Sequence, residues 1–208
     1  MIVFGALLSP YVRKVCVALA EKGVDYELKL SRPRNPDPDF LAASPFGKIP
    51  AMKHGDYTLA DSSAIVAYVD AVWPEPALIP ADPKLRGRAI WFDEFSDTIL
   101  AGSGLKVLFN RYVAPVVFKK EGNEAVAQKG MEELPPIWAY LESQVPEQGW
   151  LVDAFSIADL SIASMIRSLE HVDAQPCATL YPRTAAWYQR VCARPSWIQV
   201  AAEDSAKG

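Results

Sequence analysis

Hydroxyl and carboxylate side chains stand at two places where the sequence predicts the start of a helix. Ser9 and Tyr11 fall in ALLSPYVRKV, where Ser9-Pro10 is a common helix beginning. Asp61 and Ser62 fall in LADSSAI, at the start of an apolar helical repeat. The free N–H groups and the dipole of a helix N-terminus favour anions, so both places could hold a negatively charged group. Each could equally do no more than cap its own helix.

Strand and helix patterns alternate in the first part of the chain. The apolar spacing predicts strands at residues 2–6, 24–30, 49–54 and 57–60, and helices at 10–22 and 61–72. Gly55-Asp56 supplies the turn of a hairpin between the last two strands. Residues 32–39 contain three prolines, which predicts a loop. A parallel crossover followed by an antiparallel hairpin indicates a small mixed α/β domain.

Only helical patterns follow the proline-rich segment 73–83. We predict four helical stretches: one from residue 82 to about 113 with a bend at 102–104, one broken or kinked at Pro135-Pro136, one opening at 156–159, and one over 182–193 that Arg194-Pro195 ends. The segment 73–83 is the expected linker. The prediction is therefore two domains, residues 1–77 and 84–208.

Composition narrows the class of protein. The 208 residues are 50% hydrophobic and 22% charged, which is typical of a globular chain, and the net charge of −4 does not favour a nucleic-acid or anionic-membrane partner. No apolar run has the length of a membrane span, and no basic residue precedes the first apolar run, as a secretory signal would require. An odd count of three cysteines without paired spacing, and two histidines with no CxxC or HExxH, favour reduced thiols, no metal and a cytoplasmic location.

Five motifs along the chain resemble those of the cytosolic glutathione transferases: SPYVRKV, EKGVDYEL, SPFGKIPAM, LADSSAI and FSIADLSIA. Their order and spacing extend the resemblance over essentially the whole chain, and the similarity is greatest to bacterial serine-type members related to the theta and phi classes. The resemblance implies a thioredoxin-like domain with the order β-α-β-α-β-β-α, followed by an all-helical domain. It also implies a homodimer, and a detoxifying enzyme that transfers glutathione to small hydrophobic electrophiles.

The resemblance assigns Ser9 as the catalytic residue, whose hydroxyl holds the glutathione thiolate. A cysteine at this position would form mixed disulfides with glutathione, whereas a serine leaves the thiolate free to attack another molecule. Tyr11 is a second candidate for the donor, although the resemblance favours a place for it beside the second substrate.

Glutathione itself is expected to contact three further segments. By resemblance, Lys48 lies near the glycine carboxylate, although an exposed lysine is usually only solvated. The N–H and C=O of Ile49, which precedes a cis Pro50, would pair with the cysteinyl part like an added strand. Asp61 would pair with the γ-glutamyl ammonium, and Ser62 would bind the γ-glutamyl carboxylate.

A hydrophobic pocket for the second substrate is also implied. Its candidate residues are Leu7, Tyr11, Leu105, Leu108, Phe109 and Tyr112. Family analogy places Trp91 and Phe95 of the long helix in a dimer interface. Ser156 and Asp159 have the spacing of a capping box, so we expect them to start a buried helix and not to act in catalysis.

Two alternatives remain open. One is a glutathione-dependent dehalogenase, isomerase or peroxidase-type activity, although the isomerase start SSCSWRV is replaced here by SPYVRKV. The other is a non-catalytic module that uses the same fold to bind a partner. Such a module predicts a damaged glutathione site, whereas this chain keeps Ser9, Pro50 and Ser62.

Overall fold

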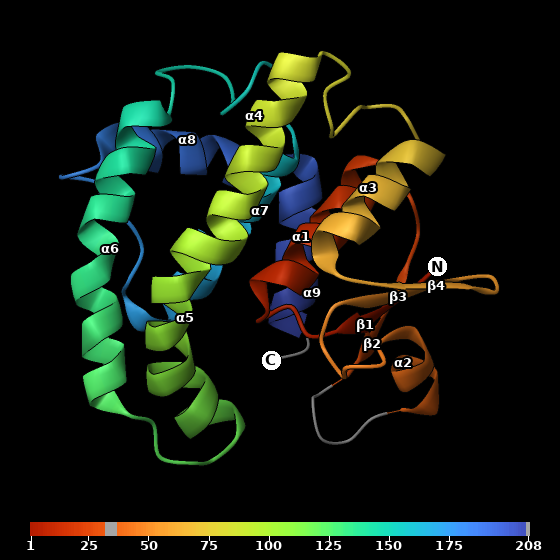
Figure 1. Cartoon of the computed structure of the whole chain (residues 1–208), viewed down its shortest axis with the longest axis horizontal. Helices are drawn as coiled ribbons and strands as arrows, with labels where there is room; N and C mark the ends of the chain where they lie inside the picture. Colours follow the sequence, from red (N-terminus) through yellow and green to blue (C-terminus); the bar gives the residue numbers. More distant parts are fainter. Residues whose placement is uncertain (32–36, 207–208) are drawn as a thin grey trace. The chain divides into compact units, whose positions relative to one another are not determined.

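The computed structural model of the chain describes residues 1–31 and 37–206 and divides into two compact units (Figure 1). Unit 1 comprises Met1–Ala81 and the segment that begins at Cys192, and unit 2 is Asp82–Val191. The C-terminal helix thus belongs spatially to unit 1, while the boundary at residues 77 and 84 stays our proposal for the domains.

Unit 1 is built on a four-stranded sheet with the order β2-β1-β3-β4. Its elements are β1 (Ile2–Gly5), α1 (Pro10–Glu21), β2 (Glu27–Leu30), α2 (Pro38–Ala43), β3 (Ala51–His54), β4 (Tyr57–Ala60), α3 (Ser62–Val72) and α9 (Pro195–Ala206). β1 pairs with β2 in parallel and with β3 antiparallel, and β3 and β4 form the predicted hairpin. Helices α1 and α3 pack together on one face of the sheet, and α2 lies on the other face (Figure 1).

Two sequence predictions in unit 1 need correction. The loop predicted over 32–39 contains a helix from Pro38 onward, because Asp37 caps it by accepting from the Asp39 N–H at 2.8 Å; residues 32–36 lie outside the described part. The strand predicted from residue 24 forms only from Glu27, and Leu30 at its end is 64% exposed.

Helix α1 approaches the end of β1 very closely. A Cβ on Gly5, whose φ is +155°, would lie 2.4 Å from a methyl carbon of Val12. Glycine is therefore required where the chain leaves β1, because any side chain would push the first turn of α1 away from the sheet.

Helix α9 follows Arg194-Pro195, which the sequence predicted only as an end. Pro195 is the first residue of the new helix, a position that suits proline. Arg194 donates to both carboxylate oxygens of Glu21 at 2.6 and 2.7 Å, and the Ser196 hydroxyl donates to the same carboxylate. Burial opposes ionisation of Glu21, but these hydrogen bonds hold its pKa below the ordinary value, so the ionised pair joins α9 to α1.

Unit 2 is helical in its described residues. Its elements are α4 (Pro83–Glu94), the π-helical η1 (Phe95–Leu100), α5 (Ala101–Leu108), the π-helical η2 (Phe109–Val117), α6 (Glu124–Gln144), α7 (Ile157–Leu169), the short 3₁₀ segment η3 (Glu170–Val172) and α8 (Pro182–Cys192). The segments α4, η1, α5 and η2 follow one another as a single long helical path, and α5 packs along α6 (Figure 1).

The bend and the break that the sequence predicted in these long helices are not where the structure has its irregularities. Gly102–Gly104, where a bend was expected, lies within the α-helix α5. The α-helical hydrogen bonding changes to π-helical hydrogen bonding on either side of α5, in η1 and η2. Helix α6 continues through Pro135 and Pro136. Both prolines are exposed, so the carbonyl groups that lose their N–H donors can bind water, while the buried Leu134 and Trp138 on the other side hold the helix in place.

Asp159 connects the start of α7 to two other parts of unit 2. Its carboxylate accepts from the N–H groups of Ser156 and Leu151, both at 3.1 Å, and from the Trp187 indole at 2.8 Å. The bond to Ser156 belongs to the predicted capping box. Complete burial raises the pKa of Asp159 to about 6. The structural role predicted for this residue agrees with these contacts.

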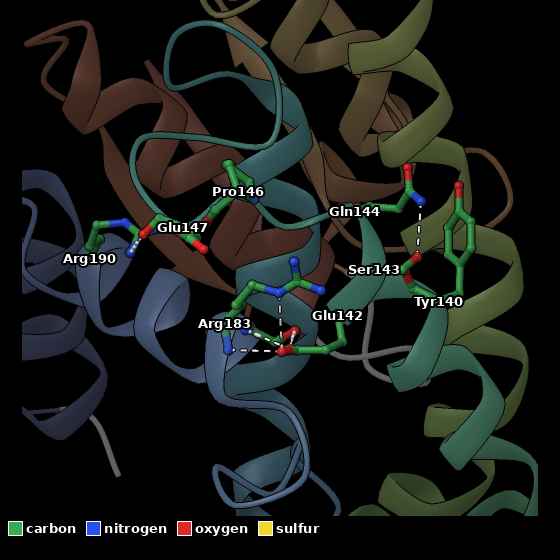
Figure 2. A network of polar contacts seen from close by, with 9 residues as sticks. Tyr140, Glu142, Ser143, Gln144, Pro146, Glu147, Arg183 and Arg190 are labelled. Carbon is green, nitrogen blue, oxygen red and sulfur yellow. Dashed lines mark hydrogen bonds and ion pairs between the residues drawn. The ribbon is translucent and has the colours of Figure 1, made fainter.

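Helix α8 is held in a similar way by side chains at its two ends (Figure 2). Glu142 of α6 accepts from the N–H groups of Arg183 and Thr184 at 3.0 and 2.8 Å, which satisfies donors in the first turn of α8. Arg190 in the last turn donates to the carbonyl oxygens of Pro146 and Glu147 at 3.3 and 3.2 Å. These contacts bind the loop after α6 to α8.

We predict that Asp159→Ala lowers the free energy of unfolding by about 3 kcal/mol or more, because it leaves three buried N–H donors without an acceptor. The measurement is urea denaturation followed by tryptophan fluorescence, with the exposed Asp153→Ala from the preceding loop as the matched control. Glutathione affinity measured below the unfolding transition should be unchanged. A variant that unfolds like the parent but has lost activity would show that Asp159 acts in catalysis after all.

Candidate functional site

The sheet register brings three of the predicted segments to one end of the sheet. Phe4 near the end of β1 pairs with Ala51 at the start of β3, and Ala51 pairs with Ala60 at the end of β4. Three segments therefore lie at the same end of the strands: the turn to Ser9, the segment ending at Pro50, and the Asp61 turn. This juxtaposition in unit 1 is the candidate site.

Ser9 is the N-cap residue of α1, but its side chain does not cap the helix. Its backbone is extended, with φ −72° and ψ 124°, and its carbonyl accepts from the Arg13 N–H at 3.0 Å. The hydroxyl is half-buried and makes no hydrogen bond to another described residue. The Ser9 side chain therefore does not cap α1, and its hydroxyl can donate to a ligand at the positive end of the α1 dipole.

A serine hydroxyl fixes the segment before β3. The Ser44 hydroxyl donates to the Lys48 carbonyl at 2.7 Å and accepts from the Lys48 N–H at 3.0 Å. The bond between Ile49 and Pro50 is cis, as the resemblance implied. The Ile49 side chain packs on the core residues around Phe4, whereas Lys48 is exposed. The backbone of Ile49 is thus held at the site by the Ser44 hydrogen bonds to Lys48 and by the packing of its own side chain.

The third segment has an unusual backbone. Asp61 has φ +81°, a value that residues other than glycine rarely adopt and that occurs preferentially at functional sites. Its Oδ1 accepts from the N–H groups of Ser63 and Ala64, both at 3.0 Å. Ser62, the first residue of α3, is 3% exposed, and its hydroxyl has no hydrogen-bond partner among the described residues. The turn therefore presents the Ser62 hydroxyl, from which a carboxylate could accept at the positive end of the α3 dipole, while the Ser63 and Ala64 N–H groups are already satisfied by Asp61.

The residues predicted for the second-substrate pocket belong to both units. In unit 1, Leu7 is 5% exposed and Tyr11 is half-buried in the first turn of α1. In unit 2, Leu108 is 3% exposed and Leu105 is half-buried, while Phe109 is exposed. The Tyr112 ring packs on the His171 ring with centroids 4.8 Å apart. The two leucines at 3% and 5% contribute mainly to packing, and the pocket stays a prediction.

Three supporting residues were given no role from the sequence: Ser44, Lys14 and Ser63. Ser44 was part of a quoted motif but was given no role, although a serine four residues before Lys48 is a signal for such a local bond. Lys14 of α1 is 1% exposed, and its ammonium donates to the Ser63 hydroxyl at 3.0 Å. This bond joins residues 49 positions apart, so no local pattern could have indicated it.

Among residues 1–31 and 37–206, His, Cys, Asp and Glu side chains form no group of three or more that could hold a metal ion. Within the same ranges, no helix combines the length and apolarity needed to cross a membrane.

Comparison with known proteins gives a consistent result. Family models for the glutathione S-transferase N-terminal and C-terminal domains match residues 3–77 and 108–199. Glutathione S-transferase 4 of Zea mays is 30% identical over 212 residues, which cover 96% of this chain and 91% of the relative. A glutathione S-transferase structure from Rhodospirillum rubrum has a TM-score of 0.86 at 25% identity, covering 94% of this chain and 89% of that one. The structure of glutathione S-transferase-I bound with lactoylglutathione has a TM-score of 0.85 at 24% identity, covering 97% and 98%.

The chain belongs to the glutathione S-transferase family. The predicted thioredoxin-like first domain and helical second domain are confirmed. The Zea mays relative is a plant protein, so the bacterial, theta- and phi-related subclass is not confirmed.

We predict that Ser44→Ala weakens glutathione binding about five- to tenfold, because it removes two hydrogen bonds that fix the backbone before Ile49. Calorimetric titration of glutathione measures the change. The exposed Ser143→Ala, which removes a serine from unit 2, is the control. Unchanged affinity in Ser44→Ala would mean that the Lys48–Pro50 segment does not contact glutathione.

Proposed function

We propose that this protein is a serine-type glutathione transferase, in which Ser9 activates the thiol and the thiolate is added to a small hydrophobic electrophile. The observation that supports this most directly is the Ser9 hydroxyl, which stands at the N-terminus of α1 without capping the helix. The same site has the Ile49 backbone and the Ser62 hydroxyl at one edge of the sheet. Glutathione is the co-substrate in this proposal.

The chemistry requires a thiolate at neutral pH. An unperturbed thiol has a pKa of about 8.5. A hydrogen bond to a charged group contributes about 1.5–3 kcal/mol, equivalent to about one to two pKa units, and the helix dipole adds up to about 2 kcal/mol. The Ser9 hydroxyl and the N-terminus of α1 together are therefore sufficient to ionise most of the bound thiol without a general base.

The remaining contacts would hold the tripeptide along the sheet edge. The N–H and C=O of Ile49 pair with the cysteinyl segment, and the exposed Lys48 ammonium faces the glycine carboxylate. The Ser62 hydroxyl, at the positive end of the α3 dipole, takes the γ-glutamyl carboxylate. Asp61 uses Oδ1 for its own turn, which leaves Oδ2 to accept from the γ-glutamyl ammonium.

In the reaction, the sulfur lone pair forms a bond to the electrophilic carbon. The bonding electrons leave with the displaced group or move onto an acceptor that then takes a proton from solvent. Catalysis consists of thiolate stabilisation and proximity. For the apolar pocket we propose the residues that the family resemblance implied: Leu7, Tyr11, Leu105, Leu108, Phe109 and Tyr112. A reductive, isomerising or peroxidase-type reaction would use the same thiolate with a different second substrate.

We also propose a homodimer. In unit 2, Trp91 is 46% exposed, its indole N–H donates to the Tyr140 hydroxyl at 2.9 Å, and the Phe95 ring packs against Tyr140 at 5.2 Å. Trp91 and Tyr140 are exposed and fit an interface between copies, whereas Phe95 is 2% exposed and packs beneath them. A monomer in sedimentation velocity at micromolar concentration would contradict it.

The test of the function is an ultraviolet titration of the thiolate of bound glutathione against pH. We predict that Ser9→Ala raises the pKa of the bound thiol by about one unit or more, because it removes the hydroxyl donor. The control is Tyr11→Phe, which removes the other nearby hydroxyl and should leave that pKa within a few tenths of the parent.

Two results would contradict the assignment. If the lowered thiol pKa survives in Ser9→Ala but not in Tyr11→Phe, the tyrosine is the donor. If the parent does not bind glutathione at all, the fold serves as a partner-binding module and not as a transferase.

A further inference from the structure

Lys14 is a buried cation that the proposed chemistry does not use. It lies in α1 and is 1% exposed, which ranks it among the largest fully buried side chains of the chain. Removing an ammonium from water is costly unless hydrogen bonds or opposite charge compensate. The Lys14 ammonium is compensated by contacts within the fold, and one of them leads to the candidate anion site.

One hydrogen bond of Lys14 leads directly to the turn that begins α3. Its Nζ donates to the Ser63 hydroxyl at 3.0 Å. The Ser63 N–H in turn donates to Asp61 Oδ1 at 3.0 Å, and Ser62 stands between these two residues. The ammonium thus fixes one side of a turn whose other side is held by the Asp61 carboxylate.

The same turn has features of an anion site that is prepared in advance. The positive φ of Asp61 is costly and persists only where neighbouring contacts enforce it. Ser62 is 3% exposed, yet its hydroxyl has no hydrogen-bond partner among the described residues. The Lys14 ammonium contacts the hydroxyl of Ser63, the residue next to Ser62, so it stands beside the positive end of the α3 dipole, and both favour a carboxylate at this point.

We propose that Lys14 is a positioning residue for the α-carboxylate of the γ-glutamyl group, acting through Ser63 and through its own charge. This inference rests on the proposed glutathione function. It assigns to Lys14 the selection of thiols that carry this carboxylate, because a ligand without it gains nothing from the buried charge.

A pair of ligands separates this role from a structural one. Glutathione and 4-aminobutyryl-cysteinylglycine differ only in the γ-glutamyl α-carboxylate. We expect Lys14→Met to weaken glutathione binding about tenfold and to change the affinity of the analogue less than twofold, as measured by calorimetry. Lys14→Arg keeps the charge and should recover most of the glutathione affinity, while Ser63→Ala should give part of the loss.

The matched control is Lys22→Met, which removes the lysine at the C-cap of α1. The Lys22 ammonium is bonded to Asp70 at 2.6 Å and to the Pro76 carbonyl at 2.5 Å, contacts that do not involve the α3 N-terminus. Its side chain is 0% exposed, so Lys22→Met reports the effect of losing a buried cation from the same helix. We expect it to lower the unfolding temperature with equal, small effects on both ligands.

The outcomes are distinct. Equal losses for the two ligands in Lys14→Met, or no loss for either, would overturn the proposal and leave the transferase function intact. Parent protein that binds both ligands equally would also overturn it, because the carboxylate would then not be recognised. Parent protein that binds neither ligand would instead contradict the proposed function itself.

Discussion

A thiol that is to ionise at neutral pH must meet hydrogen-bond donors that are already in place when it binds, and the proposed site depends on this constraint. The close approach of β1 and α1 at Gly5 provides this arrangement, because a Cβ there would lie 2.4 Å from Val12. It keeps the first turn of α1, and with it the Ser9 hydroxyl, next to the strand ends. Preorganised donors cost no rearrangement when charge appears, which is why they stabilise an anion better than water does.

Helix α1 connects this site to the rest of unit 1. It packs against α3 through the contact between Lys14 and Ser63, and against α9 through the ion pair between Glu21 and Arg194. The segment before β3 is held separately by Ser44. Each part of the candidate site therefore has its own anchor in the fold. Unit 2 follows the same principle, since Asp159 and Glu142 satisfy the backbone donors that begin α7 and α8.

The features that could be predicted from the sequence are those that neighbouring residues determine. The helix starts at Ser9-Pro10 and Asp61-Ser62 depend on neighbouring residues, and both were found within one residue of their predicted places. The bond between Lys14 and Ser63 depends on how α1 and α3 pack, so a lysine in a helix gave no indication of burial. The π-helical segments escaped prediction because each is short and continues an α-helix, so too few apolar positions fall within it to distinguish one helical period from the other. Pro195 was understood as the end of one helix, although the same residue begins α9.

The most direct test of the central claim is the proton released when glutathione binds. Calorimetry at pH 7 in two buffers of different ionisation enthalpy measures this release, with S-methylglutathione as the ligand that has no ionisable thiol. We predict that glutathione releases about half a proton or more on binding, because the bound thiol has a pKa near or below neutrality. S-methylglutathione should release none. Binding of glutathione without proton release would contradict it, since the site would then hold the thiol and not the thiolate.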